Sequence, residues 1–434
     1  MGTLILPAGR ETFGGAGRST SDVKPGAIVP FVVALALLAT GCVATQGGPG
    51  SDASGARTAS DARTGSTATG ARTGCEMSAP TVTAPLVVGG SLPSEPSTAP
   101  TSALALMLGG STVDLRNYTV QLVDTNGQVV SSVDARFRSA VTGTCGNDFQ
   151  VFPAMPMFST SLGRVYYLDG DTDVRYMTPD GATGLAVRLD GSSQSVAMFS
   201  VSPDDRRIAV AVFDYRRHPV ASRLYVQDLA GGTRVDLQST GAAYRFPVGW
   251  HAGKLLVGSD STPHPGFGFY GPLPYNITSL QLLDPSTGSV VATLSSGSCH
   301  PLSSLPSSAG VACATSSLAV GRIDWSGNTT IFANGDAFTG GASLSPDGTQ
   351  LVTSGTGALL KLVSSPETGS RTITLGTSYP QAGGYPGDGG WLDAVHAVYR
   401  RAGTSNQYVI DVTSQTDVAL PPGTVLAARL PGGF

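Results

Sequence analysis

Residues 199–210 read Phe-Ser-Val-Ser-Pro-Asp-Asp-Arg-Arg-Ile-Ala-Val, and residues 342–352 repeat this pattern as Ala-Ser-Leu-Ser-Pro-Asp-Gly-Thr-Gln-Leu-Val. Proline fixes its own φ, and Asp-Gly supplies a turn with a left-handed residue, so each copy predicts two strands joined by a tight turn. Weaker copies lie along the chain at intervals of 40 to 55 residues. Their second strands begin at Val165, Ile208, Leu256, Val311, Leu351 and Ala397.

A second repeat alternates with the first. Each instance is an apolar strand, a polar turn that is usually rich in Gly or Ser, and another strand. The instances lie at Leu122, Tyr176, Val226, Leu283, Ile323, Val363 and Ile410. Two hairpins within about 45 residues are typical of a four-stranded propeller blade.

Six hairpins of the first kind against seven of the second leave one blade incomplete. Residues 425–434 read Val-Leu-Ala-Ala-Arg-Leu-Pro-Gly-Gly-Phe, with Pro-Gly-Gly where the Ser-Pro-Asp-Gly turn would stand. We expect a lone innermost strand here, completed by Leu104–Leu108 and a hairpin at 118–135. The sequence therefore predicts an all-β, seven-bladed β-propeller whose last blade is shared by both termini, with six or eight blades as alternatives.

The Ser-Pro-Asp-Gly pattern resembles the WD-like repeats of TolB-type β-propellers. The resemblance covers about residues 100–434, although only two copies are sharp. It implies a fold and carries over no functional residues.

Composition excludes several classes of protein. The chain has 434 residues with 57 Gly and 29 Pro, and only 13% of it is charged. These values exclude a long coiled coil and a mostly helical bundle. A net charge of −4 offers no basic stripe, so we expect no nucleic-acid partner.

The N-terminal region carries one apolar stretch, Ala27–Thr40, followed by Gly41 and Cys42. Its length suits the apolar region of a signal peptide better than a membrane span, which needs about 20 residues. The end of the stretch resembles the bacterial lipoprotein signal. That resemblance implies a signal peptide over 1–41, a lipid on the Cys42 thiol and anchoring to the extracytoplasmic face of the cell membrane. A plain secretory signal with an incidental cysteine is the alternative.

Val23-Lys24-Pro25, immediately before the apolar stretch, resembles the short basic start of a signal peptide. This predicts that translation begins at Val23, from a GTG codon.

Low-complexity sequence follows the proposed anchor. Residues 43–74 consist mostly of Gly, Ser, Thr and Ala, which cannot bury enough apolar surface to fold. We therefore expect a flexible tether over 42–80 and the propeller over 81–434.

Four cysteines remain besides Cys42, and an even number in an exported chain predicts two disulfides. Sequence alone leaves three pairings open. Cys299 and Cys313 fall on adjacent predicted strands, so we pair them, which leaves Cys75 with Cys145. Four unpaired cysteines in the core are the alternative.

No local motif for catalysis is present. The chain lacks Gly-x-Ser-x-Gly, His-Glu-x-x-His and Gly-x-x-x-x-Gly-Lys. Asp169–Asp173 has the spacing that begins a calcium loop, but Val174 stands where the loop needs Gly. The five histidines lie far apart in the sequence, so we expect no metal, no cofactor and no catalytic residue that can be named.

Two long connections between predicted second and third strands, 214–222 and 259–276, belong to consecutive blades and should open on one face. Long loops in compact domains are often functional, and aromatic and Arg side chains are common interface anchors. Packing of these side chains onto the blade edge is the alternative. The candidate binding face comprises Tyr215, Arg216, Arg217, His218, His264, Phe267, Phe269, Tyr270 and Tyr275.

These features favour a membrane-tethered, non-catalytic binding scaffold for an envelope protein or polymer. The alternative is a propeller enzyme, lactonase-like or glycan-active, with its site at the mouth of the central channel.

Overall fold

The computed structural model divides into the units Met1–Gly70 and Ala71–Phe434, and every residue that it describes belongs to the second unit. The described residues are 103–109, 116–139, 141–142, 150–151, 158–216, 220–239, 244–260, 279–294, 299–302, 304–334, 341–355, 359–369, 371–377, 390–401 and 406–434. The proposed signal peptide, Cys42, the tether, Cys75 and Cys145 lie outside them.

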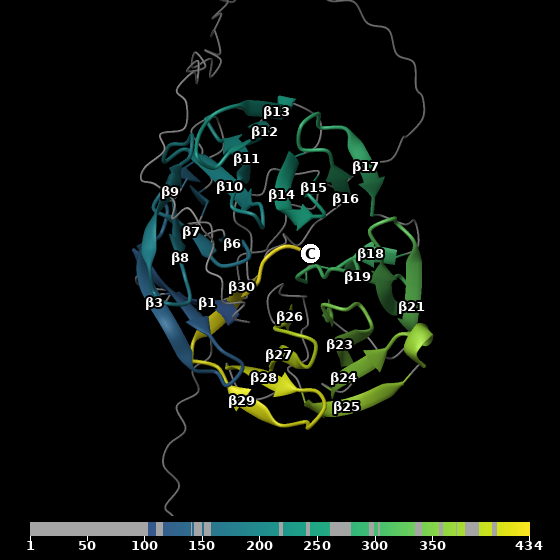
Figure 1. Cartoon of the computed structure of the whole chain (residues 1–434). Helices are drawn as coiled ribbons and strands as arrows, with labels where there is room; N and C mark the ends of the chain where they lie inside the picture. Colours follow the sequence, from purple (N-terminus) through teal and green to yellow (C-terminus); the bar gives the residue numbers. More distant parts are fainter. Residues whose placement is uncertain are drawn as a thin grey trace, which may run out of the picture. The chain divides into compact units, whose positions relative to one another are not determined.

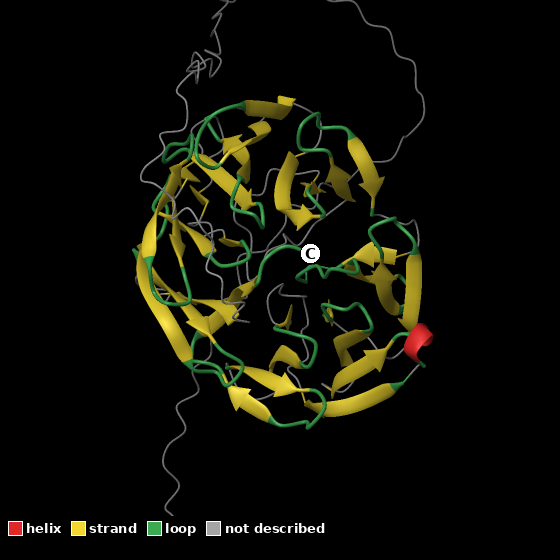
Figure 2. Cartoon of the chain, in the orientation of Figure 1, coloured by secondary structure: helices red, strands yellow, loops and turns green. Residues whose placement is uncertain are grey.

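Seven four-stranded antiparallel sheets make up this unit, together with a two-stranded sheet of β4 (Val141–Thr142) and β5 (Gln150–Val151). Helix in the described part of the chain is limited to one 3-10 turn, η1 (Pro366–Thr368) (Figure 2). The four-stranded sheets form a ring, with the first strand of each sheet toward the centre and the fourth at the rim (Figure 1). The all-β fold and the seven blades predicted from the sequence are confirmed.

Six of the blades follow one another along the chain, and we number them I to VI. Each begins with an inner hairpin, and the second strand of each hairpin contains the apolar residue predicted from the first repeat. The inner pairs are β6 (Phe158–Thr160) and β7 (Val165–Asp169), β10 (Ser195–Val201) and β11 (Arg207–Asp214), β14 (Tyr244–His251) and β15 (Lys254–Asp260), β18 (Cys299–Pro301) and β19 (Val311–Thr315), β22 (Ala342–Leu344) and β23 (Gln350–Gly355), and β26 (Gly390–Trp391) and β27 (His396–Arg400).

The outer hairpins of the same blades coincide with the second repeat. Their polar turns let the third strand fold back into the fourth at the rim. The outer pairs are β8 (Asp173–Met177) and β9 (Thr183–Arg188), β12 (Ala221–Asp228) and β13 (Arg234–Ser239), β16 (Ser279–Leu283) and β17 (Val290–Thr293), β20 (Val320–Ile323) and β21 (Thr329–Ala333), β24 (Leu359–Ser364) and β25 (Thr372–Thr377), and β28 (Gln407–Asp411) and β29 (Asp417–Ala419).

Blade VII closes the ring with strands from both ends of the described chain. The C-terminal β30 (Thr424–Leu430) is its innermost strand and pairs antiparallel with β1 (Ala103–Gly109), so that Leu104 lies opposite Arg429. The strands β2 (Asn117–Val123) and β3 (Val129–Arg136) complete the sheet in the order β3-β2-β1-β30. The predicted blade shared by the termini is confirmed. With β30 in place, each of the seven blades has its innermost strand.

The Ser-Pro-Asp turns owe their shape to side-chain hydrogen bonds that both copies make. In the first copy Ser202 Oγ donates to the Asp204 carboxylate at 2.6 Å and accepts from the Arg207 amide at 2.9 Å. In the second, Ser345 makes the same bonds with Asp347 and Gln350 at 2.6 and 3.0 Å. The fourth turn position is left-handed in both, with φ of +72° at Gly348 and +58° at Asp205. The repeat is therefore conserved within the chain as a hydrogen-bonding pattern, and Asp replaces Gly in one copy.

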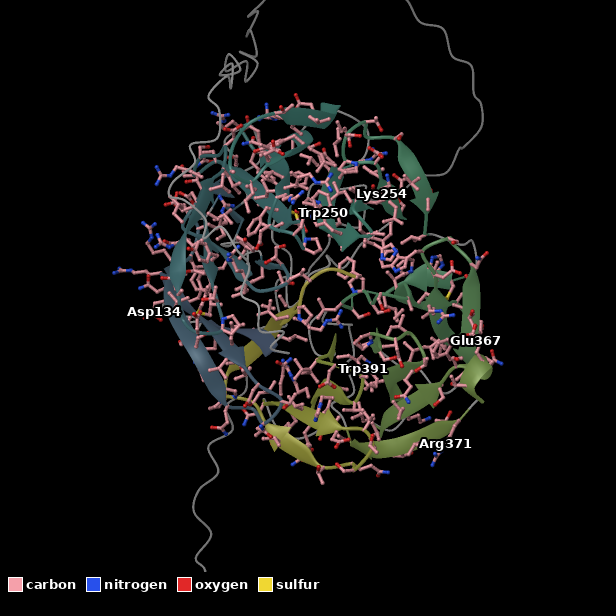
Figure 3. All side chains as sticks on the ribbon, viewed as in Figure 1. Asp134, Trp250, Lys254, Glu367, Arg371 and Trp391 are labelled. Atoms are coloured by element: carbon pink, nitrogen blue, oxygen red, sulfur yellow. A yellow bond between two sulfur atoms is a disulfide. The ribbon has the colours of Figure 1, made fainter. Side chains whose placement is uncertain are left out.

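Apolar residues of neighbouring blades form the core between the sheets. The innermost strands of blades I, II and III contact in sequence, as do β22 and β26, and β30 contacts β6 to close the ring. Trp250 and Trp391, both almost wholly buried, lie inside the ring, whereas Asp134, Glu367 and Arg371 lie at its rim (Figure 3). This packing is what positions the two edges of the ring described below.

The disulfide Cys299–Cys313 joins β18 to β19 in blade IV, and both cysteines are fully buried. The pairing expected from adjacent strands is present.

Candidate functional site

The two edges of the ring differ in their connections. At the turn face, first strands turn into second strands and third strands into fourth, as at Pro203 and Gly231. At the loop face, second strands lead into third strands. The two long connections predicted as a binding face leave the loop face at Asp214 and Asp260, from neighbouring blades II and III. The described ends of both connections therefore lie at the loop face, and the placement of the loops themselves stays a prediction.

Most of the predicted binding residues fall in segments that the structure does not describe. Arg217 and His218 lie in 217–219, and the other five lie in 261–278: His264, Phe267, Phe269, Tyr270 and Tyr275. Their role stays a prediction.

Tyr215 does not belong to an exposed binding face, because only 4% of its surface is accessible. The alternation of β11 continues past the end of the strand, so Phe213 and Tyr215 turn inward while Asp214 and Arg216 remain half-buried. Phe213 packs against Tyr244 of the next blade, with ring centroids 6.2 Å apart. Burial raises the pKa of Tyr215, so its hydroxyl stays protonated. Tyr215 anchors the base of the loop and does not offer a contact to a partner.

Arg216 lies just after the end of β11, at the start of the connection that leaves the loop face, and its binding role stays a prediction. Its Nε and Nη2 atoms donate to the two carboxylate oxygens of Asp214 at 2.8 and 2.7 Å, and its amide donates to the same carboxylate. The hydrogen bond with Asp214 raises the pKa of Arg216. Such a two-pronged pair holds a planar guanidinium at a fixed orientation. The loop therefore leaves blade II with one oriented, half-exposed Arg.

Arg138, which the sequence analysis did not single out, lies beside this site. It follows β3 and reaches from blade VII to blade II, where its Nη2 donates to the Ser195 main-chain oxygen at 2.9 Å. Burial lowers the pKa of Arg138, and the nearby Asp171 and Tyr215 raise it. The sequence around Arg138 does not indicate this position, because the residues that it contacts belong to blades I and II.

The carboxylates of the Asp169–Asp173 turn, whose spacing partly matched a calcium loop, accept hydrogen bonds from two arginines and a serine. Arg136 donates to Asp169 through Nε at 2.9 Å, and Arg188 donates to Asp173 at 2.7 Å. The amide and hydroxyl of Ser139 donate to Asp171 at 2.7 and 3.0 Å. The described residues contain no group of three or more His, Cys, Asp and Glu placed to hold a metal.

The turn face differs because the chain itself covers its centre. The connection between β18 and β19 in blade IV reaches inward, where Leu305 belongs to the same buried cluster as Leu392 of blade VI and Leu426 of blade VII. This connection is longer than the Ser-Pro-Asp turns at the same position of blades II and V. Blade IV is separated from blade VII along the ring by blades V and VI, so the connection meets blade VII near the centre of the ring.

The last four residues run over the same face toward the middle of the ring (Figure 1). The Gly432 amide donates to Ser161 of blade I at 2.7 Å, and the Phe434 amide donates to Trp250 of blade III at 3.0 Å. The Phe434 ring stacks on Trp325 of blade IV, with centroids 5.9 Å apart. Gly249 leaves room for the Phe434 ring, because a Cβ at residue 249 would lie only 2.1 Å from that ring. The C-terminal segment therefore ties blades I, III and IV together.

Comparisons with known proteins add no functional information. No known protein family and no curated protein matches the sequence. Among solved structures, the chain is similar to TolB from Acinetobacter baumannii, with 10% identity and a TM-score of 0.35 over 76% of this chain and 65% of that one. It is also similar to a chain of a mitotic checkpoint complex, with 13% identity and a TM-score of 0.38 over 64% of this chain and 78% of the other.

Proposed function

We propose that this protein is a membrane-tethered binding scaffold that engages an envelope protein or polymer through its loop face. The observation that supports this most directly is the difference between the two faces. Leu305 and the C-terminal segment cover the centre of the turn face, whereas the long connections of blades II and III both leave the loop face. A closed ring of seven blades holds these loop bases in fixed positions, which lowers the entropic cost of binding.

The proposed anchor rests on the sequence from Ala27 to Cys42. In the described residues no helix is long and apolar enough to cross a membrane. We expect radiolabelled palmitate to enter the wild-type protein in cells and to be absent from Cys42→Ser. Equal labelling of the two proteins, or none in the wild type, would refute the anchor without bearing on the loop face.

The binding face can be tested by in-cell crosslinking followed by purification through the propeller. The test variant replaces Arg216, Arg217, Phe269 and Tyr270 with Ala. Truncating an anchor at an interface hot spot costs about 2 kcal/mol, so even one true anchor among the four would weaken the complex about thirtyfold.

A matched variant carries the same number of substitutions away from the loop face: Arg206→Ala, Ser286→Ala, Asn328→Ala and Glu367→Ala. These residues are exposed and lie in turns of the turn face. We expect this variant to retain the partner. If the loop-face variant retains a recovered partner undiminished, the proposed face is wrong.

The alternative enzyme would place general acids and bases at the central channel. This alternative stays a prediction.

A further inference from the structure

The segment 431–434 is not needed to close the ring. β30 ends at Leu430, whose side chain is almost wholly buried, and each of the seven blades has its four strands without the residues that follow. These residues are exposed or half-buried, and they run from blade VII past blades I and II to blades III and IV. We call the surface beneath them the tail groove, which is lined by Thr160, Pro203, Gly249, His251 and Trp325.

Contacts that do not involve the segment hold the tail groove in place. The Trp325 indole donates to the main-chain oxygen of Ser308 at 2.9 Å, and its ring stacks on that of His251 with centroids 4.3 Å apart. Trp250, whose main-chain oxygen accepts from the Phe434 amide, is fixed by the bond of its own indole to blade II. The groove is therefore preformed, which lowers the entropic cost of binding a peptide there.

The segment is held by main-chain hydrogen bonds and one aromatic ring, which is a common way to recognise an extended peptide. The amides of Gly432 and Phe434 donate to main-chain oxygens of blades I and III at 2.7 and 3.0 Å. His251 Nδ1 lies 2.5 Å from the main-chain oxygen of Phe434, which can only accept, so Nδ1 carries the proton of this contact. The Phe434 ring stacks on Trp325 with centroids 5.9 Å apart.

The shape of the tail groove selects the sequence that fits it. A Cβ at Gly432 would lie 2.2 Å from the main-chain oxygen of Thr160. A Cβ at Gly433, where φ is +87°, would lie 2.6 Å from Pro203. Two glycines are therefore required before the aromatic residue, whose ring fills the space above Gly249.

We propose that the tail groove is a peptide-binding site for a Gly-Gly-aromatic segment of another protein, which displaces residues 431–434. The occupant is not a second copy of this chain. Four extended residues span at most about 14 Å, so an exchanged segment would force two turn faces into contact. The site is separate from the loop face. A tethered ligand competes at an effective concentration on the order of millimolar, so residues 431–434 keep the groove closed to weak or scarce partners.

Full-length variants that free the tail groove test the proposal. Phe434→Ser removes the ring, and Gly432→Ala prevents the segment from entering the groove, while both leave β30 intact. The probe is the synthetic peptide Leu-Pro-Gly-Gly-Phe with a fluorophore at its N-terminus, followed by fluorescence anisotropy. We expect saturable binding to both variants. Binding to the wild type should be about tenfold weaker, if the tethered segment at about 1 mM competes with a peptide whose dissociation constant is about 0.1 mM.

Matched glycine variants locate the binding. In the Phe434→Ser chain, Gly249→Ala should abolish peptide binding, because the added methyl group would occupy the space of the ring. Gly341→Ala is the control, because a Cβ at that residue would meet nothing within 4 Å, and it should leave binding unchanged. The peptides Leu-Pro-Ala-Gly-Phe and Leu-Pro-Gly-Gly-Ser should not bind. Equal binding to the Gly249→Ala and Gly341→Ala chains, or no binding to either freed variant, would overturn the site.

The wild type decides the matter if neither freed variant folds. Millimolar Leu-Pro-Gly-Gly-Phe should bind it in a saturable manner and Leu-Pro-Gly-Gly-Ser should not, and equal behaviour of the two peptides would overturn the site.

Two measurements test the assigned partner. Random peptides displayed on phage and selected on the Phe434→Ser chain should converge on Gly-Gly followed by Phe, Tyr or Trp, and convergence on an unrelated sequence would contradict the assigned chemistry. In equilibrium sedimentation the wild type and Phe434→Ser should have the same mass. A wild-type dimer that Phe434→Ser abolishes would show that the occupant is a second copy, and the assignment to another protein would be wrong.

Discussion

The indole N–H of Trp391 donates to the main-chain oxygen of Ser343 at 2.8 Å, and this bond links blade VI to the innermost strand of blade V. Trp250 makes the same bond to Ser200 at 3.3 Å, between blades III and II. Ser200 and Ser343 occupy the same position in the two sharp copies of the repeat, two residues before the Ser of Ser-Pro-Asp. The same interblade contact is therefore built twice.

We predict that Trp391→Phe lowers the free energy of unfolding by about 2 kcal/mol or more. The substitution leaves a buried carbonyl oxygen without its donor and opens a small cavity. Urea unfolding measures the loss. Trp325 is the control, because it is half-buried in a turn and donates to Ser308 at an exposed site. Trp325→Phe should cost below about 1 kcal/mol. Equal losses in the two variants would show that the interblade bond contributes nothing.

Asp205 joins a strained backbone position to a buried ion pair. Its carboxylate accepts from Arg164 and from the Tyr166 hydroxyl, both in blade I. In Asp205→Gly the left-handed φ becomes unstrained, which gains about 1–2 kcal/mol. Loss of the partner of Arg164 costs about 3–5 kcal/mol. We therefore predict net destabilisation by about 1–4 kcal/mol in urea unfolding.

A double variant checks this account of Asp205. Arg164→Met in the Asp205→Gly background removes the unpaired charge and should restore part of the lost stability. If the ion pair contributed nothing, Arg164→Met would instead destabilise the wild type and Asp205→Gly by the same amount. A double-mutant cycle of unfolding free energies distinguishes the two results.

Truncation tests the closure of the ring. A chain that ends at Gly423 lacks β30, including the buried Leu426 and Leu430. Each such side chain contributes about 2–5 kcal/mol, so we expect loss of at least about 4 kcal/mol and a broad or absent thermal transition. A chain that ends at Leu430 retains the strand and loses the segment 431–434, with the bond from Gly432 to Ser161 and the contacts of Phe434. Its Tm should fall much less, and similar melting of the two truncated chains would argue against closure by β30.

Stability should fall at acid pH through aspartates that accept hydrogen bonds in the turns. The Lys254 ammonium, 2.7 Å away, and Ser286 hold the pKa of Asp284 well below its usual range. The amides of Ser414 and Thr413 lower the pKa of Asp411. Because the folded pKa lies below the unfolded value of about 3.9, this stabilisation is complete above pH 4 or so and is lost as the pH falls.

The test for Asp284 compares the wild type with Asp284→Asn in urea between pH 6 and pH 2.5. The variant should be less stable at pH 6. The difference should narrow toward pH 2.5, because the carboxyl of the unfolded wild type becomes protonated there while that of the folded protein stays ionised. A difference that stays constant with pH would contradict the assigned role of Asp284.

The sequence alone determined the blades and the way in which the ring closes. The Ser-Pro-Asp turns and the polar outer turns depend on hydrogen bonds within a few residues, such as Ser345 with Asp347, so their pattern can be read locally. Closure by β30 followed from counting, because six inner and seven outer hairpins require one more innermost strand. The pairing of Cys299 with Cys313 followed from their place on adjacent strands.

Only the tertiary structure decided which charged and aromatic side chains are exposed. Tyr215 looked like part of a loop, but the alternation of β11 continues through it and packs it inside. Arg164, Arg138 and Arg429 are ordinary arginines in the sequence, and their burial depends on blades that lie far away along the chain. The burial of Leu305 likewise depends on blades VI and VII. Local turn chemistry thus fixes the strands and their order, whereas burial and charge pairing arise from contacts between blades, which no short stretch of sequence contains.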